Sequence, residues 1–521
     1  MRHSLFRFDQ PDSRFELLEN ERGTPEDSAS APPEAVHIPN TMPENLDEAE
    51  RQLKTVFRAP QNSDLVLRKF SIGGQVGGLM AFLNGMAEGR RIDDFLLTPA
   101  LDRQLPHPIR PFSAEILQRE VFPLCESKTE RDFSEIVSAI TDGQTAVFWE
   151  GAEACLLFDT RGYCMRSVGE PFNEPVVLGP HEAFTENLRT NLTLLRRILR
   201  VPHFVSELLP SGGRNGTRLA LCYVEGVVNR SLLTEVKARL KRIDTDALLS
   251  IGAVEQRIED CPWLPLPQTL KTERPDRVAS AIADGRVALL LEGSPIACVL
   301  PVTLGMLFAS AEDAAVRRPV GTLLRIVRGA GALLSIWMPA YFLALSEHHA
   351  GQLSGEVLSV VLSSHIMVFL PLPIEMIFLL LVFQLVREAG VRVPGVVGHA
   401  IGIIGGLLLG QAAVAAHLVS TVVLIIVALS GLGNFTIPDY STQICVAYYR
   451  VALCIAATFG GFLGIGTLSL VTIAVLCSVK SFGVPMLAPF APAARSVRPF
   501  LVRGRLKSRG PQDSSNAEGR L

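Results

Sequence analysis

The second half of the chain carries almost no charge, and this constrains the fold more than any other feature. Residues 329–479 contain eight charged side chains: Glu347, Glu356, Glu375, Arg387, Glu388, Arg392, Asp439 and Arg450. Between them lie uncharged stretches of about twenty residues, which as helices are long enough to cross a bilayer core of roughly 30 Å. The sequence therefore predicts an all-α polytopic membrane domain in this part of the chain.

Five apolar segments are predicted here, so we expect a membrane domain at residues 321–480 with about five transmembrane segments. They lie at residues 329–346, 357–386, 396–416, 418–437 and 451–479. Arginines cluster before the first segment and in "REAGVRVP", whereas the loops "EHHAGQLSGE" and "AHLVS" contain none. The positive-inside rule then places the N-terminal domain in the cytosol. Five crossings would put the basic tail outside, against the same rule, so four to six crossings remain open.

The first 320 residues have a different composition. Residues 1–60 are acidic and rich in proline, and are predicted to form a disordered arm; the rest resembles soluble domains. The N-terminus lacks a signal-peptide apolar core, which also favours the cytosol. Nine cysteines without a Cys-x-x-Cys pair indicate neither a zinc site nor a redox site. The net charge of −3 does not suggest binding to nucleic acid.

A duplication divides the soluble region. "AITDGQTAVFWEG" at residues 139–151 and "AIADGRVALLLEG" at residues 281–293 match at an offset of 142 residues. Each predicts the end of a helix, an Asp-Gly turn and a buried strand. We therefore expect two tandem, similar α/β subdomains at residues 61–205 and 206–320.

Glu375 is the candidate functional residue of the membrane domain. A carboxylate within a membrane segment is costly unless it is protonated, paired or facing water, so it marks a functional site by default. The alternative is a carboxylate near the membrane surface, accommodated by the chain kink at Pro371 and Pro373.

Glycines form a second candidate feature, because small residues let helices approach closely in lipid. Four of them are spaced four residues apart, and a pair in the last segment repeats the spacing: Gly398, Gly402, Gly406 and Gly410, then Gly460 and Gly464. Two roles remain open, namely packing within one chain and contact between subunits around a pore.

The sequence contains no enzyme signature, and we predict neither a catalytic residue, nor a metal, nor a cofactor. His348 and His349 are interpreted as ordinary residues of an interfacial loop. Asp276 is expected to cap the start of a helix. Arg189, Arg196 and Arg197 are expected on the solvated face of an amphipathic helix. Residues 481–521 form a juxtamembrane segment and a basic tail, which either contacts anionic membrane lipids or is solvated.

The chain resembles the A subunits of the GerA-type nutrient germinant receptors of bacterial endospores. The resemblance covers about residues 60–492 and is specific, because the matching motifs are long and in order. They are "GPHEAFTENLRTNLTLLRRIL", "YVEGVVNRSLLTEVKARLKRID", "PLPQTLKTERPDRVASAIADGRVALLLEGSPIACVLPVT", "REAGVRVP", "LGQAAV" and "SFGVPMLAPFAP". We expect "GPHEAFTENLRTN" to belong to the first subdomain and "TERPDR" to the second.

This resemblance implies a receptor complex in the spore inner membrane, with a transporter-like B subunit and a lipoprotein C subunit. It also implies self-association of A subunits into a path for ions, which turns nutrient binding into the ion release that starts germination. Two other hypotheses remain open: a secondary transporter that moves a small solute, and a receptor scaffold that conducts nothing. A duplication confined to the soluble domain argues against the transporter.

Overall fold

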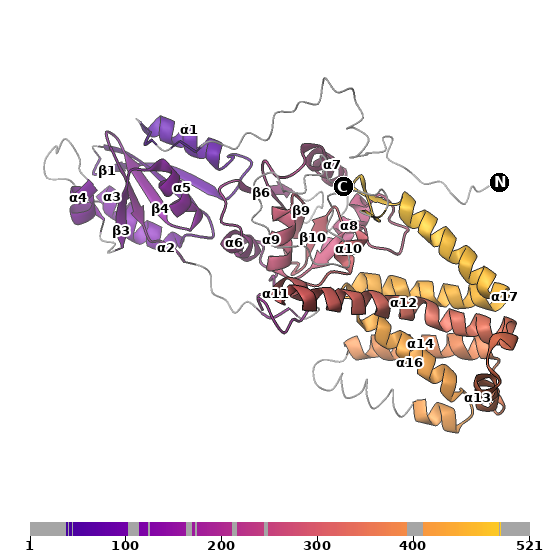
Figure 1. Ribbon diagram of the computed structural model, residues 1–521. Helices are drawn as coiled ribbons and strands as arrows, with labels where there is room; N and C mark the ends of the chain where they lie inside the picture. The colour runs from indigo at the N-terminus through magenta and orange to yellow at the C-terminus, as the bar shows by residue number, and fades with distance from the viewer. Residues whose placement is uncertain are drawn as a thin grey trace, which may run out of the picture.

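The computed structural model describes residues 38–490, apart from residues 40, 44, 75, 103–113, 123–125, 163–168, 172–173, 211–215, 244–247, 393–409 and 489. Two α/β subdomains and a helical bundle follow one another along its length (Figure 1). The predicted fold class, a duplicated α/β region followed by apolar helices, is confirmed.

The first subdomain is an antiparallel sheet covered by helices on both faces. Its strands run in the order β1 (Leu65–Ile72), β2 (Val76–Leu83), β4 (Thr145–Trp149), β5 (Cys155–Phe158), β3 (Ser127–Glu130). One face packs against α1 (Leu46–Val56) and α5 (Phe133–Thr141). The other packs against α2 (Gly89–Ile92), η2 (Asp93–Leu97), α3 (Thr98–Asp102), α4 (Ala114–Ile116) and η3 (Leu117–Val121).

The second subdomain repeats this arrangement. Its strands run in the order β6 (Phe204–Pro210), β7 (Arg218–Val224), β9 (Val287–Leu291), β10 (Ala297–Leu300), β8 (Leu270–Thr272). Helices α6 (Leu188–Ile198) and α9 (Pro275–Ala283) cover one face, and α7 (Arg230–Lys241) and α8 (Ile251–Ile258) cover the other. The strand order therefore matches that of the first sheet, position by position.

The repeat is longer than the motif that revealed it. Helices α1 and α6 are capped by Asn45 and Asn187, which lie 142 residues apart, and each side chain accepts from the backbone N–H three residues on. Gly143 and Gly285 close the Asp-Gly turns with φ of 93° and 89°, a left-handed conformation that favours glycine. The same local chemistry therefore builds both copies.

The boundaries of the two subdomains differ from those expected. Helix α1 lies within the range assigned to a disordered arm, but Leu53 and Val56 are buried against the first sheet. Helix α6, which carries "LRTN" directly after its cap Asn187, packs on α9 and on the core of the second sheet. The "GPHEAFTENLRTN" motif therefore belongs with the second subdomain, because its apolar side chains are buried there.

The bundle is built from long helices that lie side by side (Figure 1). They are α12 (Arg318–His348), α14 (Leu372–Arg392), α16 (Thr421–Phe435) and α17 (Tyr440–Ser478), with the shorter η4 (Ala350–Gln352) and α13 (Gly355–His365) at one end. Helices α10 (Leu304–Leu307) and α11 (Glu312–Ala315) lead into α12. Among the described residues, α12 and α17 are each long and apolar enough to span a membrane.

Two of the predicted apolar segments are each divided in the structure. Helix α17 breaks at Gly461, where φ is 53° and ψ is −136°, into helices at 440–460 and 462–478. The segment predicted at 357–386 becomes α13 and α14, separated by the turn before Leu372. Hydropathy did not mark the break in α17, because a reversal of the chain needs no polar residue when one glycine supplies the turn. The division before Leu372 coincides with the kink expected at Pro371 and Pro373.

After α17 the chain returns to the second subdomain. The two-stranded hairpin β11 (Lys480–Ser481) and β12 (Val484–Pro485) places Phe482 and Val484 in the core beneath α7 and α8. The amide of Leu304 donates to the carbonyl of Met486 at 2.8 Å. The bundle is thus joined to the second subdomain both where the chain enters it and where the chain leaves it.

Candidate functional site

Glu375 is fully buried in the bundle, in the first turn of α14. Its Oε1 accepts from the backbone N–H of Ser420 at 2.5 Å and from the Ser420 hydroxyl at 2.8 Å. Ser420 is the N-cap of α16, so the carboxylate lies at the N-terminal ends of two helices. Those ends carry partial positive charge, which stabilises an anion.

The second oxygen of Glu375 has no hydrogen-bond partner among the described residues. It lies 3.8 Å from Nδ1 of His365, at the end of α13, and that nitrogen is also without a hydrogen bond there. One half of the carboxylate thus joins two helices, while the other half is available to a proton, a cation or a protonated histidine.

His348 and His349 bond to backbone carbonyls of the bundle. His348 Nε2 lies 2.9 Å from the carbonyl of Thr458, and His349 Nδ1 lies 3.2 Å from that of Ala344. Within the described part of the chain, no three His, Cys, Asp or Glu side chains converge on one point.

The structure describes three of the six predicted packing glycines, since Gly398, Gly402 and Gly406 lie outside the described residues. Gly410 faces the Leu424 side chain at an ordinary contact distance, 3.7 Å from where a Cβ would lie. Gly460 has open space beside it. Gly464 faces the carbonyl of Ala456 across the break in α17, where a side chain would collide. Gly464 therefore serves the reversal of this helix within one chain.

The closest helix approach uses glycines that the spacing pattern missed. A Cβ on Gly433 in α16 would collide with the backbone carbonyl of Gly331 in α12. A Cβ on Gly331 would lie 2.5 Å from the hydroxyl of Thr436, and one on Gly431 would collide with the Phe383 ring. Gly431 and Gly433 are two residues apart, so a search for four-residue spacing passes over them.

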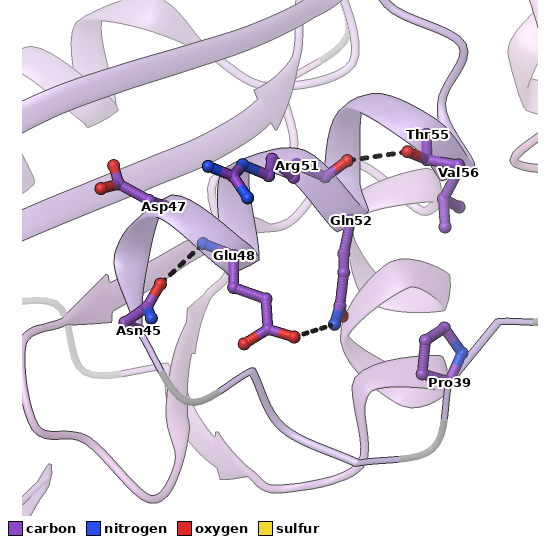
Figure 2. A pocket seen from close by; sticks show the side chains of 8 residues that line it. All are labelled: Pro39, Asn45, Asp47, Glu48, Arg51, Gln52, Thr55 and Val56. Carbon is purple, nitrogen blue, oxygen red and sulfur yellow. Dashed lines mark hydrogen bonds between the residues drawn. The ribbon is translucent and has the colours of Figure 1, made fainter.

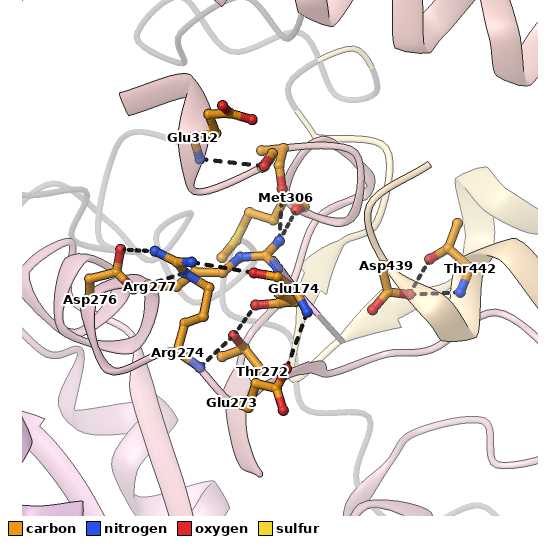
Figure 3. A network of polar contacts seen from close by, with 12 residues as sticks. Glu174, Thr272, Glu273, Arg274, Asp276, Arg277, Met306, Glu312, Asp439 and Thr442 are labelled. Carbon is orange, nitrogen blue, oxygen red and sulfur yellow. Dashed lines mark hydrogen bonds and ion pairs between the residues drawn. The ribbon is translucent and has the colours of Figure 1, made fainter. Parts of the chain in front are cut away.

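A polar network holds the entry to the bundle (Figure 3). Arg277 in α9 donates to Oε1 of Glu174 at 2.6 Å and to the carbonyls of Met306 and Ala309, each at 2.9 Å. Next to it, Arg274 is buried and binds Asp276 at 2.8 Å. Asp276 does lie in the first turn of α9, but its carboxylate accepts from Arg274 rather than from the helix.

A buried carboxylate anchors the start of α12. Asp313, which is 1 % exposed, pairs with Arg325 at 3.0 Å and with Arg328 at 2.8 Å, one helical turn further along. These arginines belong to the cluster before the first apolar segment that suggested a cytosolic N-terminal domain. Their ion pairs to a buried aspartate give them a structural role as well.

The exit from the bundle is held by direct bonds to the second subdomain. Ser481 donates to the carbonyl of Gln268 at 2.7 Å, and the N–H of Phe482 donates to Asp260 at 2.9 Å. The guanidinium of Arg239 lies 4.5 Å from the Phe482 ring centre. Burial and the neighbouring Glu255 raise the pKa of Glu259, beside Asp260, to about 7.

A buried ion pair joins the two subdomains. Arg196 in α6 is 2 % exposed and binds Asp64 at 2.8 Å, and Ser206 donates to the same carboxylate at 2.5 Å. The expectation that Arg196 is solvated was wrong, because α6 lies between the subdomains rather than on the surface. Arg189 and Arg197 are more exposed, with Arg197 paired to Glu182 at 3.1 Å.

Two of the hollows that the described residues form lie on the soluble region. One is a cleft of about 1080 Å³ between the subdomains, beside α6. The other lies along the outer face of α1 (Figure 2), where Asn45 accepts from the N–H of Glu48 and Gln52 donates to the Glu48 carboxylate. These bonds cap and stabilise α1 itself, so the second hollow offers no converging group to a ligand.

The fold defines a class of membrane protein in which a duplicated α/β domain is joined at two points to an apolar helical bundle. The chain belongs to the GerA family, described as Bacillus/Clostridium GerA spore germination proteins, which matches residues 51–513. It is an A subunit of that family. The predicted resemblance is confirmed, as is the expectation that the protein is not an enzyme.

Several relatives match over most of the chain. Spore germination protein KA of Bacillus subtilis is 32% identical over 474 residues, covering 90% of this chain and 85% of that protein. The uncharacterized membrane protein YfkQ of the same organism is 32% identical, covering 85% and 86%. The crystal structure of the N-terminal domain of the A subunit of the Bacillus megaterium germinant receptor GerK3 is 25% identical, covering 51% of this chain and 98% of that one, with a TM-score of 0.41.

Proposed function

We propose that this A subunit converts nutrient binding by its receptor complex into ion release across the spore inner membrane, and that an oligomer of A subunits forms the ion path. The observation that carries the proposal is the half-bonded Glu375 carboxylate inside an apolar bundle. A buried carboxylate oxygen without a partner is costly, and function is the usual reason for keeping one.

Membership of the GerA family supports a proposal for the partners. We propose a transporter-like B subunit that binds the nutrient and a lipoprotein C subunit. The soluble domain would lie in the cytosol, where the entry network and the exit hairpin couple its second subdomain to the bundle. A nutrient signal that moves either part would then be transmitted to the other.

Replacing Glu375 by glutamine tests the ion path. The amide oxygen can still accept both bonds from Ser420, so the fold is expected to persist while the charge is lost. We expect potassium efflux from liposomes carrying the reconstituted receptor to fall roughly tenfold, a change of about 1.4 kcal/mol in the barrier.

Glu356→Gln is the matched control, because Glu356 is an exposed carboxylate at the same end of the bundle. Its efflux should equal that of the wild type. Equal efflux from Glu375→Gln and from the wild type would remove Glu375 from the ion path and leave it as a helix cap.

That outcome would favour a second candidate, a subunit that transduces the signal without conducting ions. The observation in its favour is the pair of bonds from Glu375 to Ser420, which already gives the carboxylate a role in joining α14 to α16. In this case potassium would leave through another subunit, and the wild-type A subunit alone would give no efflux at any protein density.

We also propose an even number of membrane crossings. The second subdomain holds the residues before α12 through Asp313 and the residues after α17 through Ser481. Both ends of the bundle therefore lie on the same side. Two passes within α17 would make six together with α12, α14, α16 and the predicted segment at 396–416, most of which lies outside the described residues. The basic tail would then lie on the cytosolic side, as the positive-inside rule requires.

Labelling with a membrane-impermeant maleimide tests this topology. Gln352→Cys, in the loop between α12 and α13, is expected to react in intact cells, and Phe490→Cys only after lysis. The unsubstituted protein gives the background from native cysteines. Reaction of Phe490→Cys in intact cells would establish an odd number of crossings and contradict the proposal.

A further inference from the structure

Within the described part of the bundle, two arginines are buried without an anionic partner. Arg387 in α14 is 8 % exposed and Arg450 in α17 is 1 % exposed. Among the described residues, both Nη atoms of Arg387 and the Nε of Arg450 lack a hydrogen-bond partner. A buried charge that lacks a counter-charge is strongly destabilising, so a bundle that retains two of them is incomplete by itself.

The groups around Arg450 are neutral. Its Nη1 donates to the Ser430 hydroxyl at 2.9 Å and to the Ser335 hydroxyl at 3.4 Å. The Ser430 hydroxyl in turn donates to the carbonyl of Ser335 at 2.8 Å. These bonds align the guanidinium between α12, α16 and α17 but supply no negative charge.

The nearest carboxylate along α17 is already engaged. Asp439 caps α17, its Oδ2 accepting from the N–H and the hydroxyl of Thr442, each at 2.6 Å. Arg387 instead lies against the Tyr440 ring, 5.7 Å from its centre. An anion beside Arg387 would supply the counter-charge that the described bundle lacks.

The position of these residues indicates the kind of anion. Thr436, between α16 and α17, donates to the carbonyl of Arg328, which pairs with Asp313 beside the second subdomain. Arg387, beside Tyr440 at the start of α17, therefore lies toward the end of the bundle that faces the soluble domain, which the proposed topology places at the cytosolic surface of the membrane.

Tyr440 separates Arg387 from the surface of the bundle. Its ring lies against the Arg387 guanidinium, and Tyr440 is 45 % exposed. Tyrosine is typical of the membrane interface, and basic pockets between helices on the cytosolic side suit anionic headgroups. A guanidinium group forms paired hydrogen bonds with phosphate.

We propose that Arg387 binds the phosphate of an anionic phospholipid at the surface of the bundle beside Tyr440. The Nη atoms of Arg387 are enclosed by protein, so binding requires its side chain to turn outward past Tyr440. Such a lipid would join α14 to α17 at the end of the bundle nearest the soluble domain.

Purified full-length protein, in complex with its receptor partners where they copurify, provides the test. We expect phosphatidylglycerol to copurify, as measured by mass spectrometry, and to raise the melting temperature of delipidated protein more than phosphatidylcholine does. In Arg387→Gln the apparent affinity for phosphatidylglycerol should fall roughly tenfold, because the charge-assisted hydrogen bonds are lost.

Arg317→Gln is the matched control, because Arg317 is an exposed arginine at the same end of the bundle. It should bind phosphatidylglycerol as the wild type does, and an equal loss in this variant would reveal general surface attraction and overturn the proposal. Arg387→Lys keeps the charge without the paired donors and should bind with intermediate affinity, which separates recognition from misfolding.

Three further results would overturn the proposal. The first is wild-type protein that does not distinguish phosphatidylglycerol from phosphatidylcholine. The second is stabilisation by inorganic phosphate alone equal to that by the lipid, which would indicate a small-anion site. The third is unchanged lipid binding in Arg387→Gln. This result would indicate that a carboxylate of a partner subunit, and not a lipid, neutralises Arg387 and Arg450.

Discussion

Gly433→Leu is expected to prevent the bundle from folding, because it places a side chain where two helix backbones touch. A Cβ at this position would collide with the backbone carbonyl of Gly331, which cannot move away without displacing α12. Overpacking against flexible side chains typically costs about 1–3 kcal/mol, and a backbone obstacle should cost more. The measurement is the yield of monodisperse protein in detergent, which we expect to fall to background.

Gly466→Leu is the control for this prediction, because Gly466 has open space beside it and also lies in an apolar helix, α17. Its yield should match that of the wild type. Normal yield and melting temperature in Gly433→Leu would mean that α12 and α16 do not cross as closely as described.

The contrast between Gly433 and the predicted glycines illustrates what the sequence can reveal. A spacing of four residues identifies one face of a helix, but the identity of the neighbouring helix determines whether that face needs glycine. Gly460 has the predicted spacing and open space beside it, whereas Gly433 lacks the spacing and touches backbone. Close helix approach depends on tertiary geometry, which a single sequence does not contain.

The duplicated fold could be predicted because it rests on local chemistry. Asp-Gly turns with matched positive φ and the caps Asn45 and Asn187 are short-range features that recur at a fixed offset. The burial of Arg196 could not be predicted in this way. Its partner Asp64 is 132 residues away, and an arginine on a helix is usually solvated unless such a partner is present.

The number of membrane crossings could be predicted only in part. Charge and hydropathy predicted the membrane domain and left four to six crossings open. The break at Gly461 could not be recognised, because residues 451–479 contain no charge to mark a turn. The proposed even number of crossings rests on a contact between residues 213 positions apart, Ser481 with Gln268.

Phe482→Ala is expected to separate the end of the bundle from the soluble domain. The Phe482 side chain is fully buried in the core of the second subdomain, under the guanidinium of Arg239. Replacing a buried phenylalanine by alanine typically costs about 3–5 kcal/mol. This loss should weaken the docking of the hairpin. The core cluster that contains Phe482 is made of residues of the second subdomain and of the hairpin itself.

Hydrogen exchange of the backbone amides of residues 480–486 measures this directly. We expect strong protection in the wild type and rapid exchange in Phe482→Ala, while the strands β9 and β10 remain protected. Phe490→Ala is the control, since Phe490 is 65 % exposed. In this variant the β11–β12 hairpin should remain protected.

If the hairpin is docked as described, Phe482→Ala should also uncouple the receptor, with nutrient still bound by the complex and ion release lost. Protection of the hairpin in Phe482→Ala would show that the bonds of Ser481 suffice, and that the signal does not depend on the aromatic anchor.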